Sequence, residues 1–266
     1  MGRLIGYMAN RADRLRDALH QEREVIAVPS SHPPAGWGIG FYQGGEVLHK
    51  KRPLHGEDMD WEQVANGVRS DCVIIHMRHA TVGDFRSENT HPFRMRSWLF
   101  AHNGTIQRFS AVRERLVETM PDFIRRNIRG DTDSEHFFHV VLSFLHDAGQ
   151  LDHPDVADKA VLNALRSAVR LVDRLGKEVG ASDAVLNLIL SNGRRMYALR
   201  RGAPMMITER EGIHDPAGDG DDGSTPTRYV LVASDGAAAA PTGYRMLDDA
   251  SVCIVDRDLR VGTHAL

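Results

Sequence analysis

The chain has 266 residues, a formal net charge of −3 and 42% apolar residues, which suits a globular protein with a sizeable core. The near-neutral balance excludes the overall basic surface of a nucleic-acid-binding protein, and no apolar run reaches membrane-spanning length. With two cysteines and no signal-peptide apolar region at the N-terminus, the chain is expected in the reducing cytoplasm, away from the membrane.

The first part of the chain predicts strands separated by short helices. Arg3 to Met8 forms an apolar strand, and Arg11 to Glu24 has the apolar spacing of a helix. Trp37 to Leu48 predicts a β-hairpin that turns on paired glycines. Trp61 to Arg69 then predicts a short helix, and Cys72 to Met77 a buried strand.

The middle of the chain predicts helices. Trp98 to Ala101 is a strand that stops at Asn103-Gly104, and Ser110 is placed to cap a helix that ends at Thr119. Asp133 to Leu145 and Val156 to Val179 both carry apolar stripes at helical spacing.

The last part of the chain returns to strands. Val185 to Leu199 predicts a hairpin turning on Asn192-Gly193, and Tyr229 to Ala233 and Val252 to Val255 predict further strands. The stretch from Glu211 to Arg228 is rich in Gly, Asp and Pro and predicts a mobile loop. Strands, then helices, then strands again indicate an α+β domain of layered sheets and helices.

Three groups of residues have the chemistry of an amino-acid site. Arg78 leaves a buried strand, where a guanidinium is a natural fork for a carboxylate. The predicted turn at Asn103-Gly104 can aim an amide NH2 and a backbone N–H at one point, as an oxyanion hole requires. Asp133 starts a helix and can hold a cationic amine. Together they predict a site for an amino acid whose side-chain carbonyl is attacked.

Each of these groups also has a structural alternative. Arg78 could form an ion pair, Asn103-Gly104 could be only a tight turn, and Asp133 could be only a helix N-cap. Their occurrence together favours the site.

A cluster of histidines raises the alternative of a zinc site. His76, His79, His91 and His102 lie close in the sequence, and imidazole is a common zinc ligand. In a strand, however, His76 and His79 point to opposite faces, and no cysteine or carboxylate has ligand spacing beside them. We therefore expect structural histidines, with no metal and no cofactor.

Several strings resemble those of class II glutamine amidotransferases: MRHATVG, ENTHPF, WLFAHNGTI and GDTDSEHF. They are most similar to a small stand-alone bacterial branch, which includes amidohydrolases of γ-glutamyl compounds such as the one in ergothioneine synthesis. GRLIGYMAN and WGIGFY also fit, and the later part of the chain matches more loosely through LVASDG. The resemblance implies a four-layer αββα N-terminal-nucleophile hydrolase fold and one type-2 amidotransferase domain over residues 1–266.

The resemblance also implies residue roles. Arg78 would bind the substrate α-carboxylate, with His79 and Thr81 lining the pocket beside it, and Asp133 would bind the α-amine. Asn103-Gly104 would form the oxyanion hole. In the family, the initiator Met is removed, and the new N-terminal cysteine attacks the side-chain amide with its own α-amine as base.

This sequence has Gly2 at the nucleophile position, so no thioester can form there. Cys72 lies far back along the strand that ends at Arg78, and Cys253 stands in a late apolar strand with no matching motif. We predict a pseudoenzyme that binds glutamine or a γ-glutamyl compound, with any ammonia acceptor or synthase on another chain. The alternatives are an engineered or erroneous Cys-to-Gly change, hydrolysis by water with the Gly2 amine as base, and an interaction module with a vestigial pocket.

Overall fold

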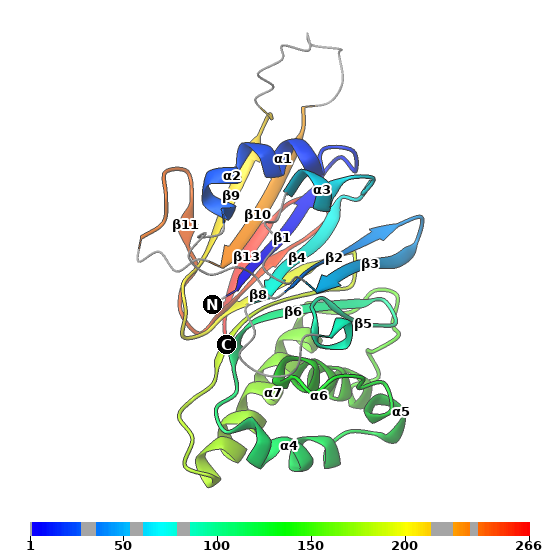
Figure 1. Cartoon of the computed structure of the whole chain (residues 1–266), viewed down its shortest axis with the longest axis vertical. Helices are drawn as coiled ribbons and strands as arrows, with labels where there is room; N and C mark the ends of the chain where they lie inside the picture. Colours follow the sequence, from blue (N-terminus) through cyan, green and yellow to red (C-terminus); the bar gives the residue numbers. More distant parts are fainter. Residues whose placement is uncertain (1, 28–35, 54–60, 79–85, 214–225, 235–238) are drawn as a thin grey trace.

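The structure, a computed structural model, describes residues 2–27, 36–53, 61–78, 86–213, 226–234 and 239–266. Two antiparallel sheets pack face to face, and helices cover the outer face of each sheet (Figure 1). This four-layer αββα arrangement confirms the α+β fold class.

The larger sheet has seven strands in the order β11-β9-β10-β1-β4-β2-β3. Its strands are β1 (Arg3–Ala9), β2 (Gly36–Gln43), β3 (Glu46–Pro53), β4 (Cys72–Arg78), β9 (Met205–Glu211), β10 (Arg228–Ser234) and β11 (Arg245–Met246). The smaller sheet has six strands in the order β13-β12-β8-β7-β6-β5. These are β5 (Phe93–Met95), β6 (Trp98–Thr105), β7 (Val185–Ser191), β8 (Met196–Arg200), β12 (Ser251–Val255) and β13 (Val261–Ala265).

The helices form the two outer layers (Figure 1). The larger sheet is covered by α1 (Leu15–Gln21), α2 (Arg23–Ile26) and α3 (Trp61–Ala65). The smaller sheet is covered by α4 (Phe109–Glu118), α5 (Asp122–Arg125), α6 (Asp133–Asp147) and α7 (Asp158–Glu178). A short 3-10 helix, η1 (Ser87–Asn89), precedes β5.

Side-chain alternation along β1 explains how one strand serves two apolar cores. Leu4 and Met8 pack between the sheets, whereas Ile5 and Tyr7 pack against the outer helices. Gly6 also faces the inner layer, where an added Cβ would lie 2.5 Å from the Met196 sulfur. A glycine here lets the two sheets approach each other.

The helix predicted over Arg11 to Glu24 is divided in the structure. Glu22 separates α1 from α2, and its buried carboxylate accepts hydrogen bonds from Arg210 Nε at 2.8 Å, Tyr229 Oη at 2.7 Å and Tyr244 Oη at 2.6 Å. These bonds fasten the helical corner to β9, to β10 and to the segment before β11.

Two further expectations need correction. Ser110 is not an N-cap, because α4 already begins at Phe109 after Arg108, which has a left-handed φ of 52°. The stretch Glu211 to Arg228 is not wholly a loop, because its ends complete β9 and β10 through their antiparallel pairing. The mobile loop predicted between them falls largely on residues 214–225, which lie outside the described residues.

We expect Glu22→Gln to lower the free energy of unfolding by about 3 kcal/mol, because the substitution removes the charge from a buried, hydrogen-bonded group. Urea denaturation at pH 7 measures this loss. Glu24→Gln is the control: Glu24 is exposed on the same helical corner and should change stability by less than about 0.5 kcal/mol. Equal losses in the two variants would contradict the role of Glu22.

The decrease in the free energy of unfolding caused by Glu22→Gln should also depend on pH. Burial opposes ionisation of Glu22, yet the hydrogen bonds from Arg210, Tyr244 and Tyr229 hold its pKa below the ordinary value. A carboxyl with a lowered folded-state pKa stabilises the protein above its unfolded-state pKa of about 4.3, and this stabilisation is lost as pH falls through the folded-state value. The difference between parent and variant should therefore shrink in acid.

Candidate active site

Residue 2 is held where the two sheets meet. Asn103 Nδ2, on β6, donates to the Gly2 carbonyl at 2.6 Å and to Ser234 Oγ at 2.9 Å. Ser234 ends β10 beside β1, and its Oγ also accepts the Leu4 N–H at 3.0 Å. The start of β1 is therefore fixed by groups from both sheets.

Asn103 and Gly104 do not form the predicted turn. They lie inside β6, in register with Asn187 and Leu186 of β7, and this pairing continues the strand to Thr105. A Cβ at Gly104 would lie 1.9 Å from the Val185 carbonyl oxygen. The glycine is thus required by the close approach of β7, and the Asn103 side chain is presented from a strand.

Arg78 lies at the end of β4 and is 4% exposed. The antiparallel register pairs Arg3 with Met77 and Gly36 with Arg78, so Arg78 is at the same end of the sheet as Gly2. The predicted pocket residues His79 and Thr81 lie outside the described residues.

Asp133 begins α6, but it is not the N-cap. That position belongs to Thr132, whose side chain accepts the Glu135 N–H. The Asp133 carboxylate accepts the Ile106 N–H at 2.8 Å and the Ser134 N–H at 2.8 Å, and the side chain is buried. Ile106 follows β6 directly, so Asp133 is fastened to the end of the strand that carries Asn103. A carboxylate offers about four acceptor positions, so the anion still has capacity for a cation.

His102, for which we expected a structural role rather than zinc binding, is hydrogen-bonded beside Asp133. Its Nε2 lies 3.1 Å from the Val185 carbonyl oxygen, and its Nδ1 lies 2.9 Å from Ser134 Oγ. Because a carbonyl only accepts, Nε2 carries the proton and Nδ1 accepts from Ser134. Burial lowers the pKa of His102, although Asp133 opposes this effect. The neutral ring therefore links β6 to the start of α6 beside Asp133.

Of the other histidines of the predicted cluster, His79 lies outside the described residues. His76 and His91 place their ring centroids 4.0 Å apart. Within the described ranges, no group of three or more His, Cys, Asp or Glu side chains could hold a metal ion.

Neither cysteine lies near Gly2. Cys72 pairs with Met8, at the opposite end of β1 from Gly2, and Cys253 lies in β12. Both thiols are buried, and burial raises the pKa of each to about 11. At neutral pH they are therefore thiols rather than nucleophilic thiolates.

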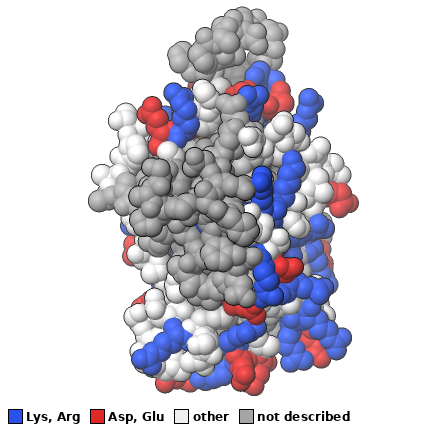
Figure 2. Space-filling model, viewed as in Figure 1, with Lys and Arg blue, Asp and Glu red and all other residues white. Residues whose placement is uncertain are grey.

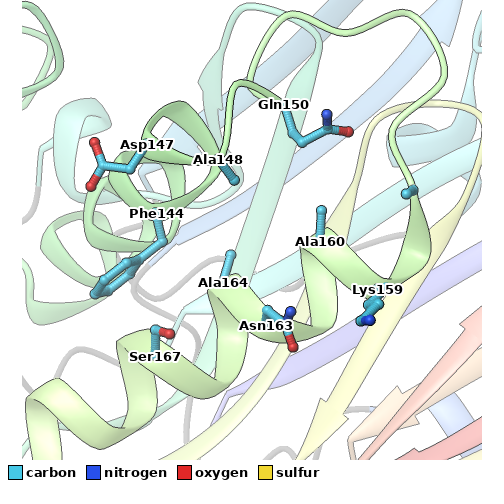
Figure 3. A pocket seen from close by; sticks show the side chains of 10 residues that line it. Phe144, Asp147, Ala148, Gln150, Lys159, Ala160, Asn163, Ala164 and Ser167 are labelled. Atoms are coloured by element: carbon cyan, nitrogen blue, oxygen red, sulfur yellow. The ribbon is translucent and has the colours of Figure 1, made fainter.

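A hollow of about 580 Å³ lies elsewhere, between the C-terminal half of α6 and the N-terminal half of α7 (Figure 3). Figure 3 shows that its side chains come from both helices and the connection between them. Its lining carries Asp147 and Lys159 as its ionisable groups, and Asp147 is about four turns along α6 from Asp133. The hollow is therefore separate from the cluster around Gly2.

The sequence of this chain is similar to those of known amidotransferases and hydrolases. The family model for glutamine amidotransferases class-II matches residues 20–223. The probable glutamine amidotransferase DUG3 of Saccharomyces cerevisiae is 26% identical over 65% of this chain and 50% of its own length, so this chain matches about half of that relative. The γ-glutamyl-hercynylcysteine sulfoxide hydrolase of Mycobacterium tuberculosis is 29% identical over 74% of this chain and 73% of its own.

A solved structure shares the fold across almost the whole chain. Glutamine phosphoribosylpyrophosphate amidotransferase from B. subtilis superposes with a TM-score of 0.60 at 13% identity, covering 99% of this chain and 49% of its own. This likeness confirms the N-terminal-nucleophile architecture that the sequence resemblance implied. No helix in the described ranges is long and apolar enough to span a membrane.

Gly104→Ala should destabilise the protein by about 1–3 kcal/mol, because its Cβ has no room beside the β7 backbone. Gly176→Ala in α7 is the control, since a Cβ there meets only Ala181 at 3.6 Å, an ordinary contact. Thermal unfolding of both variants checks the prediction. An unchanged melting temperature for Gly104→Ala would show that the strands do not approach as described.

The two native thiols should resist Ellman's reagent at pH 7.5 while the protein is folded, because both are buried and protonated. Both should react at once in guanidinium chloride. Rapid labelling of either cysteine in the folded protein would reopen the possibility of a substitute nucleophile.

Proposed function

The chain belongs to the class II glutamine amidotransferase family, and on that premise we propose that it binds glutamine or a γ-glutamyl compound but turns it over poorly. The observation that carries this proposal is the Asn103 contact to the Gly2 carbonyl, at 2.6 Å. This contact supports a site built around residue 2, which has no side chain to attack with.

The ligand class follows from complementary charges. Arg78 is a cation at the end of β4 that suits an α-carboxylate, and Asp133 is a buried anion that suits an α-amine. An amino acid held at both groups would extend its side-chain amide towards Asn103-Gly104. The name of the mycobacterial relative, a γ-glutamyl-hercynylcysteine sulfoxide hydrolase, supports a γ-glutamyl group as the recognised part. We also propose that His79 and Thr81 line the substrate pocket beside Arg78.

Normal turnover in such a site would need a side-chain nucleophile at position 2. The nucleophile would attack the amide carbonyl, ammonia or an amine would leave, and water would release glutamate from the covalent intermediate. Gly2 removes the attacking atom, so only direct attack by water remains, with the Gly2 amine as base once Met1 is removed. Binding and oxyanion stabilisation alone give only a small residual rate.

The proposed oxyanion donor has a constraint that the sequence did not reveal. Both hydrogens of Asn103 Nδ2 are already directed at acceptors, the Gly2 carbonyl and Ser234 Oγ. Asn103 can therefore donate to a developing oxyanion only by weakening one of these bonds. Ser234 is the partner better able to give way, because a hydroxyl can rotate whereas the Gly2 carbonyl is fixed in the main chain.

We infer that residues 1–266 act as one amidotransferase domain. The core between the sheets supports this inference, because it joins Leu4 and Met8 from the beginning of the chain to Cys253 and Val255 near its end.

The turnover test compares the parent with Gly2→Cys, after confirming by mass spectrometry that Met1 has been removed. We expect glutamate release from glutamine, or from γ-glutamyl amides, to rise by at least about 10³-fold in the variant, because it restores covalent catalysis. Equal rates in parent and variant would contradict the assignment of position 2.

The binding test uses calorimetry on the parent with glutamine and γ-glutamyl amides. Asp133→Asn should weaken binding at least about tenfold through loss of the charge that holds the α-amine. Asp131→Asn is the matched control, because Asp131 is a half-exposed surface partner of Arg86 and Arg113. Unchanged affinity in Asp133→Asn, with its folding verified by thermal unfolding, would overturn the proposed amine site.

A further inference from the structure

A second cavity lies outside the proposed glutamine site. It has a volume of about 580 Å³ and opens between β3, η1, β5 and the start of α6. This volume is within the usual range of small-molecule pockets, about 300–1,000 Å³. None of Gly2, Arg78, Asn103, Gly104 or Asp133 lines it, so the proposed function does not account for it.

Three cations line this cavity: Lys51 from β3, Arg94 from β5 and Arg129 from the segment before α6. In the described part of the chain, none of these three side chains forms an ion pair within 4.0 Å. Figure 2 shows Lys and Arg side chains gathered on the side of the molecule that carries β3, β5 and α5. Basic side chains without paired acids favour an anionic ligand.

The carboxylates of the cavity cancel only part of this charge, because two acids, Glu88 and Glu135, face three cations. The two carboxylate oxygens of Glu135 accept hydrogen bonds from the backbone N–H groups of Arg129 at 2.9 Å and Gly130 at 2.6 Å. Glu135 therefore stabilises the backbone before α6. Glu88 is the other acid in the lining, and it is exposed. Burial lowers the pKa of Lys51 to about 8 even with both glutamates nearby, so a bound anion would favour its charged form.

His139 adds a buried hydrogen-bond acceptor. The side chain is 2% exposed, and its Nδ1 lies 2.7 Å from the Glu135 carbonyl oxygen. Nδ1 must therefore carry the proton, which leaves a lone pair on Nε2. This Nε2 is buried and has no hydrogen-bond partner among the described residues. An unsatisfied buried acceptor favours a ligand that brings an O–H or N–H group.

From these contacts we propose that the cavity binds a small anion that also carries hydroxyl groups, of the phosphorylated-polyol or hydroxy-acid class. Lys51, Arg94 and Arg129 would hold the anionic group, and a hydroxyl would donate to His139 Nε2. The Phe93 ring forms an apolar wall beside Lys51, whose Nζ lies 5.2 Å from the ring centroid. The proposal does not depend on glutamine binding.

The test is calorimetric titration of the full chain at pH 7 with glycerol 3-phosphate, with inorganic phosphate and with glycerol. We expect glycerol 3-phosphate to bind more tightly than phosphate, because only the former carries carbon-bound hydroxyls. Glycerol should give no detectable binding. A saturating amount of glutamate in the cell keeps the proposed amino-acid site filled, so that failure here is distinct from failure of the proposed function.

Lys51→Met should weaken glycerol 3-phosphate binding at least about tenfold, the effect of losing one charge-assisted hydrogen bond. Lys50→Met is the matched control: Lys50 is the next residue of β3, points to the other face and donates to the Asn66 carbonyl at 3.1 Å. The affinity of Lys50→Met for glycerol 3-phosphate should stay within about twofold of that of the parent.

Two outcomes would overturn the proposal. One is no binding of any of the three probes at millimolar concentration. The other is equal weakening in Lys51→Met and Lys50→Met, which would indicate a diffuse surface effect. Thermal unfolding of both variants confirms that they are folded. Arg129 is exposed, so Arg129→Met should leave the fold intact and provides a second variant in which the same loss of affinity is expected.

Discussion

The proposed site depends on one hydrogen-bonded junction, in which Asn103 of the smaller sheet donates to the Gly2 carbonyl and to Ser234 Oγ of the larger sheet. The apolar core between the sheets holds them together, and polar contacts such as the one from Tyr42 Oη to the Ser191 carbonyl add direction. Here an amide side chain, buried between the layers, fixes the start of β1. The same strand β6 continues to Ile106, whose N–H holds Asp133. A single strand thus sets both the position of residue 2 and that of the carboxylate proposed for the substrate amine.

A glycine at this junction has a definite chemical consequence. The contact from Asn103 is made to the main-chain carbonyl of residue 2, so it does not require any particular side chain there. The scaffold geometry at this point is therefore compatible with any side chain at residue 2, including none. We propose that the remaining polar groups bind the ligand, whereas both buried cysteines lie elsewhere and are held in the unreactive thiol form. We accordingly propose that this chain binds its ligand without hydrolysing it efficiently.

Local patterns predicted much of the fold. The hairpin on Gly44-Gly45 has both glycines at positive φ, and the helix beginning at Asp133 follows its apolar stripe. Asn103-Gly104 was predicted wrongly as a turn because Asn-Gly is a strong local turn signal, and pairing with β7 overrides it. The contacts of Asn103 with Gly2 and of Asp133 with Ile106 join residues 101 and 27 positions apart, so no local spacing could predict them. The role of His102 beside Ser134 was missed for the same reason.

The central claim is that the amino-acid site is assembled although residue 2 cannot attack. A crystal structure of the parent chain grown with saturating L-glutamine tests it most directly. The account predicts an intact glutamine whose α-amine contacts Asp133, whose carboxylate contacts Arg78, and whose side-chain carbonyl oxygen lies beside Asn103-Gly104. Glutamine bound elsewhere, or no ligand at this site under saturating conditions, would contradict the account.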